Sequence, residues 1–264
     1  FAVLLAVVAA TLAFARPVVA GEVKEAQQIV VLAIDMSLSM EAEDVAPTRA
    51  VAAREAAGVF LDTVPEGVAV GVVGFDGRAR LLISPTTRLD AVRRTIDRDS
   101  DLGEGTAIGE AVFLALDAID DAAARVDNEG LDEAKPVGTI VLLSDGDTTM
   151  GRPNDEAASE ARSRNVPVHT IAFGTDDGFV EGALGEQIAV PVNRQALEQL
   201  AFQTDGRSLS ALTAQELSQV YEDLGRSVQI EVTQTEVTEW FTGATLALLA
   251  LAGVASLAWF GRLP

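Results

Sequence analysis

The chain has 264 residues, which is enough for one good-sized hydrophobic core within one or two domains. Its 19 Lys and Arg residues against 40 Asp and Glu residues give a formal net charge of -21, which repels phosphate backbones and excludes nucleic acid as an expected partner. Cysteine is absent, so disulfides and thiolate metal sites are excluded as well.

The first segment of the chain is uncharged and apolar from Phe1 to Ala15, and the sequence opens without Met. We expect residues 1–20 to be a transmembrane helix, N-terminally incomplete, followed by a linker at 21–28. The alternative is the apolar region of a signal peptide, with small residues at Ala13 and Ala15. Either interpretation delivers the middle of the chain across the membrane.

A buried strand opens the middle of the chain. Ile29 to Ile34 is an apolar run rich in β-branched residues, which is typical of a central strand in a parallel sheet. Asp35, Ser37 and Ser39 follow at alternate positions, at the carboxyl end where open α/β sheets bind ligands. Residues two apart in an extended loop point the same way, so three hard oxygens converge. Such oxygens select Mg²⁺, Mn²⁺ or Ca²⁺.

Strands and helices alternate through the rest of the middle, which predicts an α/β fold with a doubly wound, mostly parallel sheet. Four expected helices cover residues 47–62, 89–96, 107–119 and 154–164. Pro47 lies in the first turn of the first of these, and Asn154 caps the last. Two more helices begin at the cap Asn193 and at the capping box Thr213–Glu216. The expected strands cover residues 68–75, 79–83, 139–143, 166–173 and 208–211, with 79–83 antiparallel at an edge and a hairpin excursion within 178–192.

Two further oxygen-bearing residues sit at comparable places. Thr106 precedes the helix expected from Ala107, where a hydroxyl alone would most often be an ordinary helix cap. Asp145 comes just beyond the second buried strand, 139–143, where an Asp alone would be an ordinary turn residue.

The chain ends in another apolar segment. After a linker at 229–239, residues 240–261 are 22 consecutive uncharged residues with Trp and Phe at both ends. A helix of that length spans ~33 Å, so we expect a second transmembrane helix.

The constellation Asp35-x-Ser37-x-Ser39, Thr106 before a helix and Asp145-Gly146 after a strand resembles the metal-ion-dependent adhesion site of von Willebrand factor type A (VWA) domains. The resemblance covers about residues 27–228 and implies a Rossmann-like sheet of order 3-2-1-4-5-6, with the VWA domain at 29–228. It further implies that hydroxyls of Ser37, Ser39 and Thr106 ligate Mg²⁺ (or Mn²⁺ or Ca²⁺) directly, that Asp35 and Asp145 reach it mainly through water, and that an acidic residue of a protein partner completes the shell.

The flanks resemble those of the membrane-anchored Bat (aerotolerance) type, BatA-like. The similarity lies in residues 13–17, in Asp44-Val-Ala-Pro47, and in Glu239-Trp-Phe before the last helix. It implies a multi-pass protein of the cell membrane, of bacterial origin, with its VWA domain outside the cytoplasm. It also implies a link to a MoxR-type AAA+ ATPase and other VWA membrane proteins in envelope assembly or stress tolerance.

Two other functions stay open at this point. A Mg²⁺-dependent phosphotransferase of haloacid-dehalogenase type would use Asp35 as a nucleophile, but such enzymes generally carry a second Asp where this chain has Ser37. A subunit that passes signals between an ATPase and membrane proteins would need a cytoplasmic domain. We expect no catalytic residues: His169, the only histidine, reads as a packed core residue, and Asp44 and Asp147 as solvated or turn residues.

Overall fold

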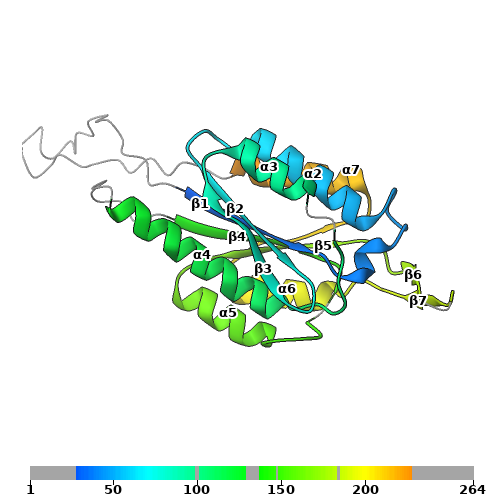
Figure 1. The fold of residues 1–264 in the computed structure, drawn as a ribbon. Coiled ribbons are helices and arrows are strands. Elements are labelled where there is room, and N and C mark those ends of the chain that lie inside the picture. Colours follow the sequence, from blue (N-terminus) through cyan, green and yellow to red (C-terminus); the bar gives the residue numbers. More distant parts are fainter. Residues whose placement is uncertain (1–27, 99–100, 129–136, 147, 183–184, 228–264) are drawn as a thin grey trace, which may run out of the picture. The chain divides into compact units, whose positions relative to one another are not determined.

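The computed structural model describes residues 28–98, 101–128, 137–146, 148–182 and 185–227 (Figure 1). The predicted membrane segments 1–20 and 240–261, the linker 229–239, nearly all of the linker 21–28, and Asp147 lie outside the described residues. Within the described part of the chain, no helix is long and apolar enough to cross a membrane.

A six-stranded sheet forms the centre of the fold, in the order β3-β2-β1-β4-β5-β8. Its strands are β1 (Gln28–Asp35), β2 (Ala69–Phe75), β3 (Ala79–Thr86), β4 (Val137–Ser144), β5 (Val168–Phe173) and β8 (Ser208–Ala211). All neighbours pair in parallel except β2 and β3, which form an antiparallel hairpin at the edge. The predicted α/β class, sheet order and antiparallel edge strand are therefore confirmed.

Seven helices accompany the sheet in the described residues. They are the short 3₁₀ helix η1 (Leu38–Glu41) and the α-helices α2 (Arg49–Thr63), α3 (Leu89–Arg98), α4 (Ile108–Asn128), α5 (Asn154–Ser163), α6 (Arg194–Gln203) and α7 (Ala214–Ser227). A separate two-stranded ribbon, β6 (Phe179–Glu181) with β7 (Gln187–Ala189), stands outside the main sheet at the predicted hairpin excursion.

The core has two halves because side chains alternate across each strand. On β1, Val30, Leu32 and Ile34 pack toward α2, α3 and α7, whereas Ile29, Val31 and Ala33 pack toward α4 and the other helices of the opposite layer. Figure 1 shows α2, α3 and α7 on one face of the sheet and α4, α5 and α6 on the other. Since both faces are covered, β1 reads as a continuous apolar run rather than an alternating one.

Several predicted boundaries were wrong, each for a local reason. Helix α2 begins at Arg49 and not at 47, because Thr48 is its cap and accepts a hydrogen bond from Val51 N–H, while Pro47 follows a cis peptide bond outside the helix. Helix α5 already includes Asn154, with Pro153 at the cap position. Strand β3 continues through Pro85 to Thr86, which an edge strand tolerates because the missing N–H can face away from the ladder.

Further differences concern element ends. Helix α4 runs on to Asn128 rather than stopping at 119, and β5 begins at Val168 rather than 166. The predicted caps of the last two helices hold: Asn193 accepts from Ala196 N–H, and Thr213 accepts from Glu216 N–H while Glu216 accepts from Leu212 N–H.

His169 differs from its expected role as a packed core residue. It is only half-buried on β5, and its Nδ1 accepts a hydrogen bond from Arg207 N–H at 2.9 Å. Burial, with a smaller effect of the nearby Arg207 charge, lowers the pKa of His169. We therefore assign it a structural role in fixing the turn before β8.

Candidate metal-binding site

The two strands that end in the predicted acidic residues are direct neighbours. Strand β1 pairs with β4 so that Ile34 lies beside Leu143, which brings Asp35 and Asp145 to the same edge of the sheet. Both side chains are almost completely buried, at 1% and 2% exposure. Strand order reverses around β1, so this edge is the switch point at which open α/β sheets form their binding crevice.

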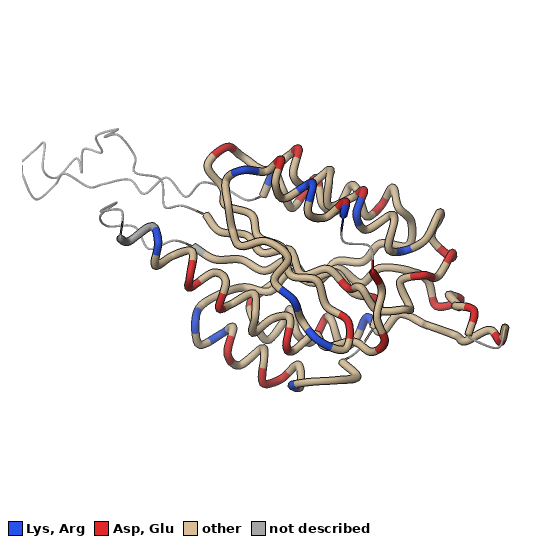
Figure 2. The backbone as a smooth tube through the Cα atoms, in the orientation of Figure 1, with Lys and Arg blue, Asp and Glu red and all other residues tan. Residues whose placement is uncertain are grey.

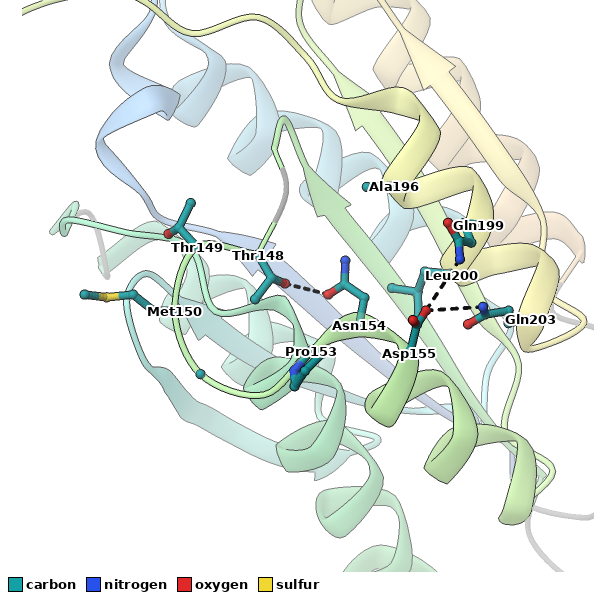
Figure 3. A pocket seen from close by; sticks show the side chains of 11 residues that line it. Thr148, Thr149, Met150, Pro153, Asn154, Asp155, Ala196, Gln199, Leu200 and Gln203 are labelled. Atoms are coloured by element: carbon teal, nitrogen blue, oxygen red, sulfur yellow. Dashed lines mark hydrogen bonds between the residues drawn. The ribbon is translucent and has the colours of Figure 1, made fainter.

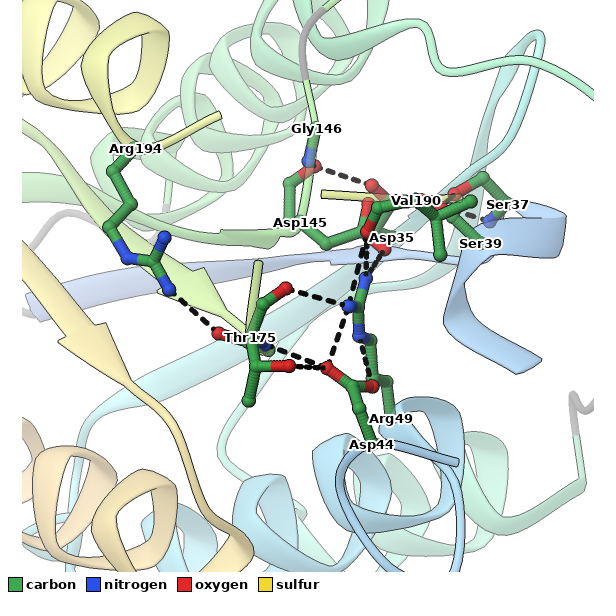
Figure 4. A network of polar contacts seen from close by, with 12 residues as sticks. Asp35, Ser37, Ser39, Asp44, Arg49, Asp145, Gly146, Thr175, Val190 and Arg194 are labelled. Carbon is green, nitrogen blue, oxygen red and sulfur yellow. Dashed lines mark hydrogen bonds and ion pairs between the residues drawn. The ribbon is translucent and has the colours of Figure 1, made fainter. Parts of the chain in front are cut away.

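A chain of hydrogen bonds joins four of the five predicted site residues (Figure 4). Ser37 N–H donates to Asp35 Oδ1 at 2.8 Å, the Ser37 and Ser39 hydroxyl oxygens lie 2.9 Å apart, and Ser39 Oγ donates to Asp145 Oδ1 at 2.9 Å. The second oxygen of Asp35 accepts from Ser144 Oγ. The oxygens of the Asp-x-Ser-x-Ser segment thus meet, as expected, but not through the extended loop that the sequence predicted, because Ser39 lies in the 3₁₀ helix η1.

Thr106 reaches the same edge through its loop. Gly103 N–H donates to Met36 O and Leu38 N–H donates to Gly103 O, both at 2.9 Å, so the loop before α4 is paired with the loop after β1. On its other side, Thr106 N–H donates to Thr149 Oγ1 at 2.8 Å, and the Thr106 carbonyl accepts from Thr149 N–H at 2.8 Å. The hydrogen bonds described for Thr106 are backbone bonds, which hold the residue while using none of its hydroxyl oxygen. It is not a helix cap, since α4 begins two residues later.

Arg49, which sequence reasoning missed, places a buried guanidinium beside this site. Its side chain is fully buried, and Nη1 donates to Asp145 Oδ2 at 2.6 Å. Nε and Nη2 bind both oxygens of Asp44 at 2.8 Å, and further N–H groups donate to the carbonyls of Thr175 and Val190 at 3.2 Å. Asp44 is therefore not the solvated or turn residue that we expected but one half of a bidentate ion pair.

Glycines make the room that Arg49 occupies. Gly174 adopts φ +115°, and a Cβ there would lie 2.4 Å from Arg49 Nε. A Cβ at Gly178 would lie 2.0 Å from Arg49 Nη2. No side chain fits at either position while the guanidinium is in place. The sequence signal that could have revealed this arrangement is weak, since an Arg at the start of a helix is ordinarily exposed.

The electrostatic balance at the site leaves negative charge uncompensated. Burial, with repulsion from Asp145, raises the pKa of Asp35 to about 7. Burial raises the pKa of Asp145 as well, against the opposing effect of Arg49. For Asp44 the hydrogen bonds from Arg49 and Thr175 outweigh burial and lower its pKa to about 2. Arg49 pairs with Asp44 and Asp145, whereas Asp35 accepts hydrogen bonds only from the neutral donors Ser37 N–H and Ser144 Oγ. A second cation would therefore be stabilised between Asp35 and Asp145.

Most of the candidate metal ligands are uncharged. Over the residues that the structure describes, no three His, Cys, Asp or Glu side chains come together in a way that would hold a metal ion. The candidate ligands are instead two carboxylates and three hydroxyls: Asp35, Asp145, Ser37, Ser39 and Thr106. Neutral and anionic hard oxygens suit Mg²⁺, Mn²⁺ or Ca²⁺.

The haloacid-dehalogenase-type alternative gains no support from this geometry. Both carboxylate oxygens of Asp35 already accept hydrogen bonds, from Ser37 N–H and from Ser144 Oγ. A carboxylate that attacks phosphorus needs a free oxygen facing the substrate. Nor does the chain carry the second Asp two residues later.

A cavity of about 450 Å³ lies behind the Thr106 loop, between the segment 148–153, the start of α5 and one side of α6 (Figure 3). Asp155 accepts weak hydrogen bonds from the amides of Gln199 and Gln203 across it. Its polar lining contains none of the five predicted site residues. Its wall nevertheless includes Thr149, whose contacts fix Thr106.

Comparisons with known proteins agree with this fold. Residues 30–147 match the family described as von Willebrand factor type A domain. A protein of Mycobacterium tuberculosis described as "UPF0353 protein" is 37% identical over 261 residues, which cover 96% of this chain and 76% of that protein.

Two solved structures share the fold. An aerotolerance-related membrane protein from Bacteroides fragilis superposes with a TM-score of 0.63 at 22% identity, covering 76% of this chain and all of that one. The proximal thread matrix protein 1 of the mussel byssus, solved with zinc in its metal-ion-dependent adhesion site, gives a TM-score of 0.54 at 18% identity, over 77% of this chain and 46% of that one. The predicted VWA family is thereby confirmed: residues 30–147 match the von Willebrand factor type A domain, and the chain belongs, by its 37% identity over 96% of its length, to the UPF0353 proteins.

Proposed function

We propose that this chain is a membrane-anchored VWA protein that captures a protein partner through a divalent cation. Ser37, Ser39 and Thr106 would hold the ion directly, and Asp35 and Asp145 mainly through water. The bound ion supplies an open coordination position for a carboxylate of the partner. The observation that carries the proposal is the chain of contacts from Asp35 through Ser37 and Ser39 to Asp145.

The residues fit Mg²⁺ in two ways. The five side chains offer hard oxygens only, and Mg²⁺ keeps several water ligands, so a full protein cage is not required. The raised pKa of Asp35 means that this position favours a neutral or cation-bound carboxylate over a free anion. Because hydroxyls donate little charge, the ion would remain electrophilic toward an incoming carboxylate.

The role is binding rather than catalysis, and we assign no catalytic residue. The fuller proposal is a multi-pass protein of the cell membrane with its domain outside the cytoplasm, acting with a MoxR-type ATPase and other VWA membrane proteins in envelope assembly or stress tolerance. It rests on the family and on the apolar segments 1–20 and 240–261. A topology reporter fused at Gln28 tests the placement, since a cytoplasmic signal there would favour the signal-passing alternative.

Affinity purification of the full chain tests the metal role. We expect partners recovered in Mg²⁺ to be lost in EDTA and in Asp35→Ala and Ser37→Ala. Ser163→Ala is the matched control, because Ser163 is an exposed serine on α5 that donates only to the Glu160 carbonyl. Recovery of partners in EDTA, or with Ser37→Ala, that equals recovery with the wild type in Mg²⁺ would refute metal-mediated capture. Hydrolysis of an aryl phosphate that Asp35→Asn abolishes would restore the enzyme alternative.

A further inference from the structure

The β6–β7 ribbon is attached to the candidate metal site by Arg49. Isolated two-stranded hairpins are marginal in water, so this one needs support at its base. Val190 N–H donates to Gly178 O at 2.8 Å and closes the ribbon, and Arg49 binds the carbonyls of Val190 and Thr175 on its two arms. The same guanidinium binds Asp145, so the ribbon projects from the edge that would hold the cation (Figure 4).

The ribbon exposes large apolar side chains on both of its faces. Phe179 pairs with Ala189, and Ile188 pairs with Val180, so the cross-strand register places Phe179 and Ile188 on opposite faces. They are 51% and 46% exposed. Strand β6 also contacts η1, where Leu38 is 38% exposed directly after Ser37. Exposed apolar residues are thus gathered next to the site, which is typical of a binding surface.

Acidic residues surround the same elements. Figure 2 shows acidic positions along the ribbon. The exposed carboxylates at this edge, in η1, β6 and the neighbouring loops, are Glu41, Glu43, Asp101, Glu104, Asp177 and Glu181. Arg49 and Arg194, which lie at this edge too, are already ion-paired, with Asp44 and Asp145 and with Asp176, respectively.

We propose that the β6–β7 ribbon is a second contact surface for the partner, and that the partner presents one carboxylate to the metal from a surface that is otherwise basic and apolar. This inference rests on the proposed function and names the chemistry of its partner. A carboxylate brought by an acidic surface would meet repulsion from the rim, whereas Lys and Arg around it are attracted. Phe179 and Ile188 supply the apolar contact that anchors an interface.

A second copy of this chain fits the surface poorly. Its net charge is -21, and the acidic rim would face an identical rim across a symmetric contact. The occupant that the charges favour is therefore a different, basic protein.

Synthetic peptides provide the probe. The Lys/Leu peptide carries one central Glu flanked by Lys and Leu, and the Asp/Ser peptide carries the same Glu flanked by Asp and Ser. The Gln peptide is the Lys/Leu peptide with Gln in place of its Glu. Binding to the full chain in detergent is measured with Mn²⁺ and with EDTA. The ribbon variant Phe179→Ser with Glu181→Lys is compared with Phe202→Ser and Glu198→Lys on α6, which makes the same two changes at exposed positions away from the ribbon.

We expect Mn²⁺-dependent binding of the Lys/Leu peptide at least about tenfold tighter than that of the Asp/Ser peptide, and no such binding of the Gln peptide. The ribbon variant is expected to lose most of that preference while binding Mn²⁺ alone as the wild type does, and the α6 variant to keep it. Equal binding of both Glu peptides, an unchanged ribbon variant, or Mn²⁺-dependent self-association in place of peptide binding would overturn the ribbon proposal and leave the metal site standing. Failure of the chain to bind Mn²⁺ at all would overturn both.

Discussion

Two carboxylates at the same sheet edge have pKa values that are shifted in opposite directions. Asp44 receives a bidentate guanidinium and two hydrogen bonds from Thr175, and its pKa falls to about 2. Asp35 receives only neutral donors, from Ser37 and Ser144, and its pKa rises to about 7. The protein therefore supplies its own cation on the Arg49 side, and under the proposed function the Asp35 side would take a cation from solution. Asp145 accepts a hydrogen bond from Arg49 with one carboxylate oxygen and from Ser39 with the other.

The largest expected effect comes from removing the internal cation. Arg49→Met leaves Asp44 and Asp145 buried without their partner, and breaking a buried ion pair in this way typically costs about 3–5 kcal/mol. Urea unfolding in EDTA measures it. The control is Arg93→Met, whose ion pair with Asp62 is exposed and worth at most about 1 kcal/mol. A loss at Arg49 no larger than at Arg93 would contradict the comparison.

The second prediction concerns Asp35, the carboxylate that Arg49 does not neutralise. Asp35→Asn keeps the shape but removes a charge that the metal needs, so we expect Mg²⁺ to stop stabilising the fold. In the wild type, Mg²⁺ at about 100 times its Kd should add about 2.7 kcal/mol to the free energy of unfolding. Thermal unfolding with Mg²⁺ and with EDTA gives the difference. Asp97→Asn, at an exposed acid on α3, should retain the full increment.

The pH dependence of the free energy of unfolding should distinguish Asp35 from Asp44. Since the pKa of Asp35 in the folded protein, about 7, is above its ordinary value of 3.8, its contribution to stability in EDTA is complete below pH 3.8 and is lost as the pH rises through about 7. Asp44 acts in the other direction: its contribution is complete above pH 3.8 and is lost as the pH falls through 2. Unfolding in EDTA across this range measures both, and Asp35→Asn should flatten the upper part of the curve alone.

The smallest effect is expected at Thr106. Thr106→Val removes the hydroxyl and preserves the backbone bonds to Thr149, so the loop should stay in place. We expect Mg²⁺ or Mn²⁺ to bind about tenfold more weakly, which corresponds to ~1.4 kcal/mol, with little change in unfolding without metal. Metal titration by calorimetry measures it. An unchanged metal affinity would remove Thr106 from the proposed ligand set.

Much of the fold could be predicted from local pattern. The apolar run 29–34 required a strand covered on both faces, and the alternation of strands and helices required a mostly parallel sheet. The resemblance then implied the sheet order. The meeting of Ser37 and Ser39 beside Asp35 was also expected, but from an extended segment, in which residues two apart face the same way. In the structure Ser39 lies in the 3₁₀ helix η1, so the turn of that helix brings its hydroxyl to Ser37. The membrane segments 1–20 and 240–261 remain predictions.

Tertiary structure alone decided the charge balance of the site. Arg49 and Asp44 are near one another in sequence, but the carbonyls of Thr175 and Val190 and the two glycines that make room for the guanidinium come from a hairpin more than a hundred residues away. The pKa of a carboxylate depends on what is packed around it, and the sequence does not display that packing. The sequence by itself determined that the apolar run 29–34 forms a strand that ends at Asp35, since strand geometry is local. Which of the carboxylates pairs with Arg49, the buried cation of the protein itself, depended on long-range packing.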